Sequence, residues 1–152
     1  MRKVLLPVDG SDSAFQATLY VIDFVQEHGP LEVHVVNVQP KPLKWQTQGA
    51  ERDVINDRQA IEAHMVMKPI LHALNEEEIA CQTHIELGDP AEALAALADE
   101  IGCDHIIMGT RGLGAISGIV RGSVARKVLH LVNIPVTCIK SATRRGKDDR
   151  RR

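Results

Sequence analysis

Hydrophobic residues along this chain fall into short apolar runs that alternate with longer segments in which apolar positions recur every three or four residues. The short runs are rich in Val, Ile and Leu, and most are followed within two residues by Asp, Gly or Pro. This pattern is typical of buried strands that end at turns. It predicts five strands, at Val4–Val8, Leu31–Val38, Cys81–Leu87, Asp104–Met108 and Val136–Lys140.

The longer segments carry helical spacing together with start signals. Residues Ser11–Ser13 supply N-cap oxygens before the first of them, while Asp89 and Pro90 suit the start of the third. Pro69 lies inside the second and has no backbone donor, so we expect a kink or a break there. The segments predict four helices, at about Ser13–Glu27, Glu51–Asn75, Ala91–Glu100 and Ser123–Val132.

Because the strands and helices alternate, the connections are expected to be right-handed crossovers between parallel strands. The predicted fold class is α/β, a doubly wound five-stranded parallel sheet of order 3-2-1-4-5 (strands numbered along the chain), with helices on both faces. In such a sheet the winding reverses between the first and fourth strands, and ligands bind beyond the carboxyl ends of the strands there. Asp9 follows the first strand and Gly109 the fourth, so we expect their loops to meet at this crevice.

Composition and charge narrow the function classes. The 152 residues fit one domain, and a hydrophobic fraction of 44% with only 3% aromatic residues predicts an aliphatic core. The tail 141–152 contains six Lys/Arg and two Asp, which gives it a net charge of +4. Residues 1–140 contain the other 12 Lys/Arg and 18 Asp/Glu, which gives them a net charge of −6. The acidic body argues against nucleic acid as a partner. The basic tail is expected to be disordered, either simply solvated or in weak contact with an acidic partner.

The chain is expected to act in the cytoplasm without inserting into a membrane. Its first apolar run is interrupted by Pro7 and Asp9 and is too short for the core of a signal peptide. No apolar run approaches the ~18 residues that a membrane-spanning helix needs. The seven histidines are scattered without a metal-binding spacing, so we expect structural or surface roles for them.

The segment Gly109–Ser123 is the most informative one for function. It contains five glycines between a predicted strand and a predicted helix. Glycines let backbone N–H groups approach an anion, and the start of a helix adds a partial positive charge. The segment lacks the Gly-Lys-Ser/Thr of a P-loop, and it follows the fourth strand, whereas the dinucleotide fingerprint follows the first. It favours a phosphate or nucleotide site, with a simple strand-to-helix connection as the alternative.

Three segments resemble the universal stress protein family, and together the resemblance covers residues 1–140. Leu5–Ser11 resembles the family's opening strand and turn, and His34–Asn37 resembles its second strand. The spacing Gly-x2-Gly-x9-Gly-Ser in Gly109–Ser123 matches the nucleotide signature of the ATP-binding branch at every fixed position. The resemblance implies one domain over 1–140 with a fold like that of the adenine nucleotide alpha hydrolases.

The resemblance also implies an ATP site. Pro7 and Val8 would line the base pocket, Asp9 would lie near the ribose or a phosphate-bound metal, and Val35 would offer its backbone to the adenine edge. The last glycine and the residues after it would present backbone amides to the phosphates. The implied site residues are Pro7, Val8, Asp9, Val35, Met108, Gly109, Arg111, Gly112, Arg121, Gly122, Ser123 and Val124.

Several of these residues have a structural alternative. Asp9 could cap the first helix, Val35 could simply pack in the core, and Ser123 could be an ordinary N-cap. Arg111 and Arg121 could pair with phosphate or lie solvated on the surface. Mg²⁺ or Mn²⁺ is expected to accompany ATP, with Asp9 as the candidate metal ligand and no dedicated protein cage.

The main hypothesis is an ATP-binding regulator of the stress response. Hydrolysis is expected to be slow at most, because no residue is marked as a base that activates water. The alternative is a protein of the same fold that binds no nucleotide and acts as a dimeric interaction partner or scaffold; AMP or a cyclic nucleotide also remains open. The family commonly dimerises through its last strand, so a homodimer through Val136–Lys140 is expected, together with an unidentified downstream protein partner.

Overall fold

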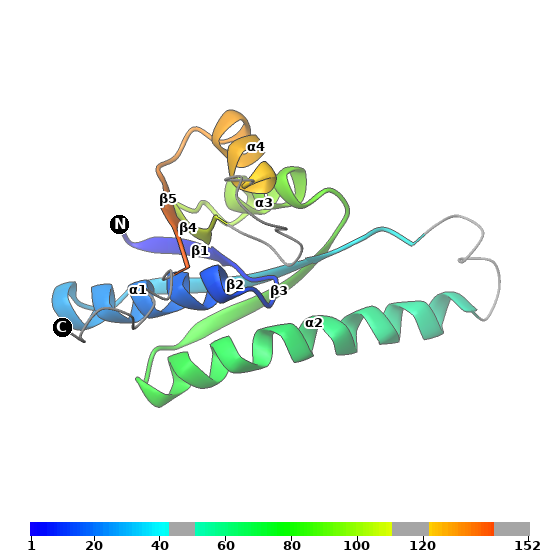
Figure 1. Ribbon diagram of the computed structural model, residues 1–152, viewed down its shortest axis with the longest axis horizontal. Helices are drawn as coiled ribbons and strands as arrows, with labels where there is room; N and C mark the ends of the chain where they lie inside the picture. The colour runs from blue at the N-terminus through cyan, green and yellow to red at the C-terminus, as the bar shows by residue number, and fades with distance from the viewer. Residues whose placement is uncertain (43–50, 111–121, 142–152) are drawn as a thin grey trace, which may run out of the picture.

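The computed structural model describes residues 1–42, 51–110 and 122–141 (Figure 1). In these ranges the strands and helices alternate along the chain, as predicted. The elements are β1 (Lys3–Pro7), α1 (Asp12–His28), β2 (Glu32–Gln39), α2 (Glu51–Glu76), β3 (Cys81–Leu87), α3 (Pro90–Glu100), β4 (His105–Gly109), α4 (Ser123–Leu131) and β5 (Val136–Ile139).

The strands form one parallel sheet of order β3-β2-β1-β4-β5, which confirms the predicted doubly wound α/β fold. From β1 the chain winds outward through β2 to β3, and it then returns to β4 on the other side of β1. Because the chain winds in two directions from β1, α1 and α2 lie on one face of the sheet, and α3 and α4 lie on the other (Figure 1). The winding therefore reverses between β1 and β4.

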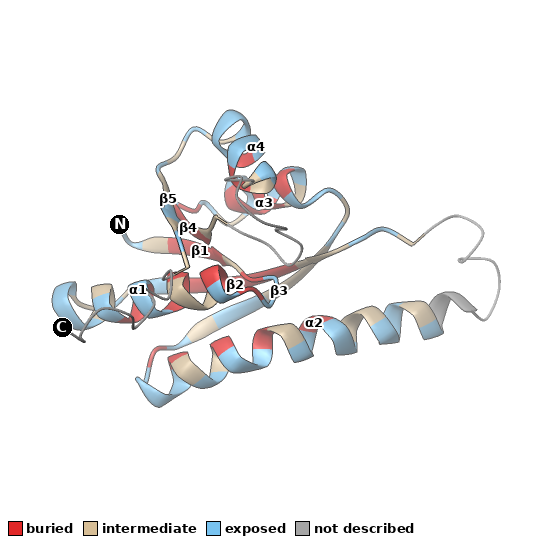
Figure 2. Ribbon diagram, in the orientation of Figure 1, coloured by how far each residue is buried: buried red, intermediate tan, exposed pale blue. Residues whose placement is uncertain are grey.

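Two apolar layers form the core, one on each face of the sheet. Side chains alternate across a strand, so Val4 and Leu6 pack under α1 and α2 while Leu5 packs under α3 and α4. In β4, Ile107 belongs to the first layer and Ile106 to the second. Figure 2 shows the buried residues along the sheet and on the helix faces that are turned toward it. Burial on both faces explains why the strands are continuous apolar runs in the sequence.

The predicted helix starts are confirmed by their capping contacts. Ser11 caps α1, since its Oγ accepts a hydrogen bond of 3.2 Å from the backbone N–H of Ala14. Asp89 caps α3 in the same way, accepting from the N–H of Glu92 at 3.1 Å, and Pro90 is the first helical residue. These short polar signals act locally, which is why they could be recognised in the sequence.

Of the two outcomes expected at Pro69, the break is wrong, because α2 continues through it from Glu51 to Glu76, and the kink stays a prediction. Proline deprives the carbonyl four residues earlier, that of Met65, of its helical donor. Both residues lie on exposed positions of the helix, where water can satisfy that carbonyl. Ile70 and Leu74, on the opposite side of α2, pack into the core and hold the helix in place across the proline.

None of the helices in the described ranges combines the length and the apolar character that a bilayer crossing requires. The disorder predicted for the basic tail concerns residues 142–152, which lie outside the described part of the chain.

Candidate functional site

The carboxyl ends of β1 and β4 lie next to each other where the winding reverses. The two strands are paired in parallel, with Val4 opposite His105 and Leu5 opposite Ile106. The loop after β1 leads directly into α1, and the end of β4 packs against the first turn of that helix. The ends of β1 and β4 thus lie at one edge of the sheet, as predicted, whereas residues 111–121 of the second loop lie outside the described part of the chain.

Gly109, the last residue of β4, packs closely against the first turn of α1. A Cβ atom at Gly109 would lie 2.5 Å from Oγ of Ser13, 2.6 Å from the carbonyl carbon of Ser13 and 2.7 Å from the backbone nitrogen of Ala14. Two of these atoms belong to the backbone and cannot rotate away. Glycine is therefore required here by the packing of β4 against α1, independently of any ligand.

Asp9 lies in the turn between β1 and α1. Its side chain is exposed, and Oδ1 accepts a hydrogen bond of 3.0 Å from the backbone N–H of Ser11. This bond orders the turn before α1 and leaves Oδ2 with no contact among residues 1–42, 51–110 and 122–141. Asp9 can consequently support the start of the helix and present an oxygen to a cation at the same time.

The start of α4 lies on the β4 side of the crevice. Gly122 is its N-cap residue, no side chain caps the helix, and the first turn contains no acidic residue. Ser123 is the first helical residue and is exposed, so the N-cap role considered for its hydroxyl is wrong. A helix start without a side-chain cap presents free N–H groups, which favour an anion.

Gly122 also has a close neighbour across the loop. A Cβ atom at this position would lie 2.9 Å from the carbonyl oxygen of Thr110 and 3.3 Å from Cβ of Ala125. The carbonyl of Gly122 accepts the first helical hydrogen bond, 2.8 Å from the N–H of Arg126. A side chain at position 122 would push the beginning of α4 away from the end of β4.

Lys127 holds α4 to the start of α3. Its Nζ lies 3.0 Å from Oδ1 of Asp89 and 3.0 Å from Oε1 of Glu92. The hydrogen bond to Glu92, followed by that to Asp89, raises the pKa of Lys127. The pKa of Asp89 is lowered, mainly by the N–H of Glu92 that it caps and then by Lys127. These exposed contacts orient α4 more than they stabilise the fold.

The sheet edge formed by the ends of β1 and β4 is apolar and tightly bonded. Val8 and Met108 are buried, on opposite faces of the sheet, and Pro7 ends β1 beside them. The N–H of Val8 donates to the carbonyl of Val36 at 2.9 Å, and its carbonyl accepts from Nδ2 of Asn37 at 2.8 Å. The backbone beneath a ligand at this edge is therefore held in one position.

Asn37 was not among the predicted site residues. Its side chain is only 4% exposed and is also bonded to Gln39, whose Nε2 donates to Oδ1 of Asn37 at 2.7 Å. The signal in the sequence is a single polar residue inside an apolar strand. Such a residue has to find partners within the protein, and here it fixes the loop that follows β1.

Val35 lies in the middle of β2, and the predicted role of its backbone toward an adenine stays a prediction. It is paired with Leu6 on one side and Thr83 on the other, and the β2–β3 pairing continues past it as far as Gln39. Its side chain is fully buried in the layer under α1 and α2. The core-packing alternative for this side chain is confirmed, and its backbone groups lie within the sheet ladder.

Three of the predicted site residues, Arg111, Gly112 and Arg121, lie outside the described residues. Of the others, Asp9, Gly109 and the start of α4 come together at one edge of the sheet. The described residues contain no cluster of three or more His, Cys, Asp or Glu side chains that could hold a metal ion. A cation at this edge would therefore take most of its ligands from phosphate oxygens, with Asp9 as the available carboxylate.

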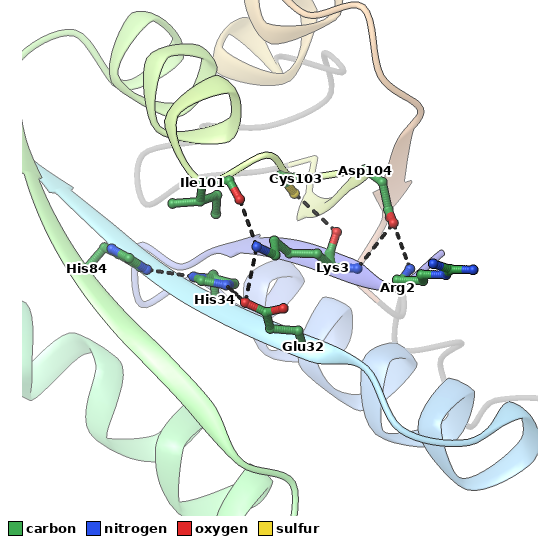
Figure 3. A network of polar contacts seen from close by, with 8 residues as sticks. All are labelled: Arg2, Lys3, Glu32, His34, His84, Ile101, Cys103 and Asp104. Atoms are coloured by element: carbon green, nitrogen blue, oxygen red, sulfur yellow. Dashed lines mark hydrogen bonds and ion pairs between the residues drawn. The ribbon is translucent and has the colours of Figure 1, made fainter.

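A second polar network lies toward the opposite end of the strands (Figure 3). Nε2 of the buried His34 is 3.0 Å from Oε1 of Glu32, and its Nδ1 is 2.8 Å from Nε2 of His84. Lys3 completes the chain, with Nζ 3.2 Å from Glu32 and 2.8 Å from the carbonyl of Ile101. The network connects β1, β2 and β3 to the end of α3.

The electrostatics of this network follow from its hydrogen bonds. The bond from His34, followed by that from Lys3, lowers the pKa of Glu32. Burial, followed by the charge of His34, lowers the pKa of His84. The structural role expected for these histidines is confirmed, although the two rings are in contact rather than scattered. The contact depends on the register between β2 and β3, in which His34 is opposite Gln82 and His84 is opposite Val36.

Comparisons with known proteins agree with this architecture. The family model that matches the chain is described as the universal stress protein family, and the match spans residues 1–140. The solved structure of the protein MJ0577, from Methanocaldococcus jannaschii, superposes with a TM-score of 0.81 at 28% identity, covering 93% of this chain and 97% of that one.

Two further solved structures contain nucleotides. A universal stress protein in complex with cAMP is 23% identical, with a TM-score of 0.64, and the superposition covers 93% of this chain and 98% of that chain. A family member from Arabidopsis thaliana with AMP bound is 19% identical, with a TM-score of 0.68 and 93% of each chain covered. At these identities the two structures establish a shared fold.

Proposed function

Since this chain belongs to the universal stress protein family, we propose that it binds ATP in the crevice between β1 and β4 and serves as a nucleotide-dependent regulator of a stress response. The observation that supports this most directly is the start of α4. It has no side-chain cap and no acidic residue in its first turn, and Gly122 holds it against the end of β4. This arrangement provides N–H donors for phosphate at the place where doubly wound sheets bind ligands.

The described residues suggest how the nucleotide would be oriented. The amides of Ser123 and Val124 would bind phosphate oxygens, and Pro7, Val8 and Met108 would provide the apolar surface beneath the base and ribose. Arg111, Gly112 and Arg121 are assigned to the phosphates by the glycine spacing alone. These assignments use charge and N–H donors that are already in place before the ligand binds.

A divalent cation is part of the proposal. Mg²⁺ or Mn²⁺ would neutralise charge on the phosphates when bound, and Asp9 would contribute the free Oδ2 of its carboxylate. The sequence marks no residue as a base that activates water. Binding that changes the conformation or the partners of the protein is therefore favoured over rapid hydrolysis.

AMP and cyclic nucleotides remain candidate ligands, given the complexes seen in two family members. The other candidate function is a dimeric interaction protein without nucleotide. It is favoured by the edge position of β5, where Cys138 is exposed and the nearby Leu129 and Leu131 leave apolar surface uncovered. We include a homodimer through this strand in the proposal, together with a downstream protein that the dimer would contact.

We assign the protein to the cytoplasm as part of the same proposal. Its cysteines, Cys81, Cys103 and Cys138, are free, which suits a reducing compartment where millimolar ATP and magnesium are also available.

The first experiment is to denature freshly purified protein, identify any released nucleotide, and titrate the refolded or emptied protein with ATP and Mg²⁺ by calorimetry. Saturable binding near one ATP per chain is the expected result. A folded protein that releases no nucleotide and binds none of ATP, AMP or cAMP would leave the dimeric interaction protein as the function.

A further inference from the structure

A long groove runs between α2 and β3, at the edge of the sheet opposite to β5. Its volume is about 1240 Å³, and most of its lining is apolar. Within the described strands, β3 is paired with β2 on one side and has no neighbour on the other. An open edge strand beside an apolar groove is a surface suited to association.

The side of α2 that borders this groove exposes Ile61 and Met65, and Val54 continues the same side of the helix outside the lining of the groove. Val54 is 67% exposed, Ile61 is 61% exposed and Met65 is 69% exposed. They are spaced by seven and four residues, so they lie along one stripe of the helix. The core face of α2 is a different one, formed by Ala63, Met67, Ile70 and Leu74. Packing of α2 on the sheet therefore leaves the stripe uncovered (Figure 2).

Two oppositely charged residues lie on this stripe, one on each side of its apolar middle part. Asp57 and Lys68 both line the groove, three helical turns or about 16 Å apart. Neither side chain forms an ion pair within the described part of the chain. Ile61 and His64 lie between them and also line the groove. The stripe thus has an acid at one end, a base at the other and apolar surface in the middle.

We propose that this stripe binds the same stripe of a second copy of the chain, with the two α2 helices antiparallel about a two-fold axis. An axis midway between Asp57 and Lys68 places Asp57 of each copy opposite the partner's Lys68. It also places Ile61 opposite the partner's His64 and Ala60 opposite the partner's Met65. The apolar contacts then lie between two identical ion pairs.

The distribution of charge on the stripe favours a second copy of the chain as its binding partner. A two-fold interface requires a surface that complements itself, and a stripe with one acid and one base at its two ends satisfies this only when antiparallel. A parallel arrangement would oppose Asp57 to Asp57 and Lys68 to Lys68. This interface is separate from the one proposed at β5, since the two lie at opposite edges of the sheet.

Charge reversal with rescue tests the interface. The full chain carrying Cys138→Lys, which discourages pairing through β5, is analysed by sedimentation equilibrium over a series of protein concentrations. The chain with an unaltered α2 is expected to dimerise. In Asp57→Lys, the new lysine of each copy would face Lys68 of the other copy. The repulsion at these two contacts is expected to raise the dimer Kd by about tenfold or more. Asp57→Lys combined with Lys68→Asp restores opposite charges and is expected to return the Kd to its starting value.

Glu62→Lys is the matched control, because it makes the same change of charge on the same helix. Glu62 is exposed, pairs with Arg58 at 3.3 Å, and lies roughly 100° around the helix from the stripe. It should leave the dimer Kd unchanged, and circular dichroism should show all variants to be helical. A chain that stays monomeric at every concentration overturns the proposal. So does an equal loss of association in Asp57→Lys and Glu62→Lys, or a charge swap that fails to restore it.

Discussion

His34 and His84 stack ring to ring across β2 and β3, with centroids 5.1 Å apart, and share a hydrogen bond of 2.8 Å between Nδ1 and Nε2. Because the carboxylate of Glu32 can only accept, Nε2 of His34 carries a proton. The contact between the two rings needs one proton, donated either from Nε2 of His84 or from Nδ1 of His34.

This pair predicts a loss of stability in mild acid. Burial lowers the pKa of His84 below its ordinary value of 6.5, so the unfolded chain takes up a proton at a higher pH than the folded chain. The free energy of unfolding should therefore fall as pH drops below about 6.5 toward the lowered pKa of His84. Urea unfolding measured between pH 5 and 8 tests this window.

The matched variant for the pair is His84→Gln, which can keep the donor to His34 but does not titrate. It should show a shallower fall in stability with acid. A smaller dependence of the free energy of unfolding on pH should remain in this variant, because burial also lowers the pKa of His105. If His84→Gln follows the same pH curve as the unchanged protein, His84 does not control the acid sensitivity.

Gly109→Ala is expected to destabilise the fold by about 1–3 kcal/mol, since a methyl group there would overlap the first turn of α1. Thermal unfolding should record a decrease of several degrees. Ser13→Ala added to this variant removes the hydroxyl but not the backbone atoms, so only part of the stability should return. Complete recovery in the double variant would show that the backbone contacts of Gly109 are unimportant.

Gly122→Val should abolish measurable ATP binding while the protein remains folded. The branched side chain would collide with the carbonyl of Thr110 and displace the start of α4, from which the phosphate donors come. Ser123→Ala is the informative comparison, because it removes one hydroxyl and keeps every backbone amide. Its loss should be about 1 kcal/mol of binding free energy. Calorimetric titration that finds Gly122→Val binding normally would refute the phosphate site.

Asp9 can be tested for its two roles separately. Asp9→Asn keeps an oxygen that accepts from Ser11 and removes the charge, whereas Asp9→Ala removes both. If Asp9 holds the cation, both variants should lose ATP affinity in Mg²⁺, and neither should lose much in EDTA. Asp12→Ala, an exposed acid in the first turn of α1, serves as the control. If only Asp9→Ala loses ATP affinity, Asp9 stabilises the turn before α1 and does not hold the cation.

Cys138→Lys should weaken the dimer that is proposed through β5. The residue is exposed on the edge strand, and a lysine at an open edge disfavours pairing with another strand. Sedimentation velocity should show a shift toward smaller species, and Cys138→Ser should leave the assembly unchanged. Identical sedimentation of both variants and the unaltered chain would place the contact elsewhere.

The sequence by itself determined the order of elements, the strand order and the edge at which the candidate site lies. Helix starts at Ser11 and Asp89 depend on neighbours only three residues away, and strands buried on both faces must be apolar throughout. Such signals are local, so they are present in the chain before it folds. The spacing of glycines, which is also local, predicts a phosphate loop in residues that lie outside the described part of the chain. Local propensity failed at Pro69, where packing of the helix in the core outweighed it.

Only the tertiary structure decided which side chains meet. Gly109 is required because of Ser13, His34 is paired with His84, and Asn37 binds the carbonyl of Val8. These partners are separated by 29 residues or more in the chain. Their contacts depend on strand register and on the distance between layers, which emerge when the whole sheet is assembled. The groove beside α2 has the same origin, because a stripe of helix is exposed or covered according to what the rest of the fold places against it.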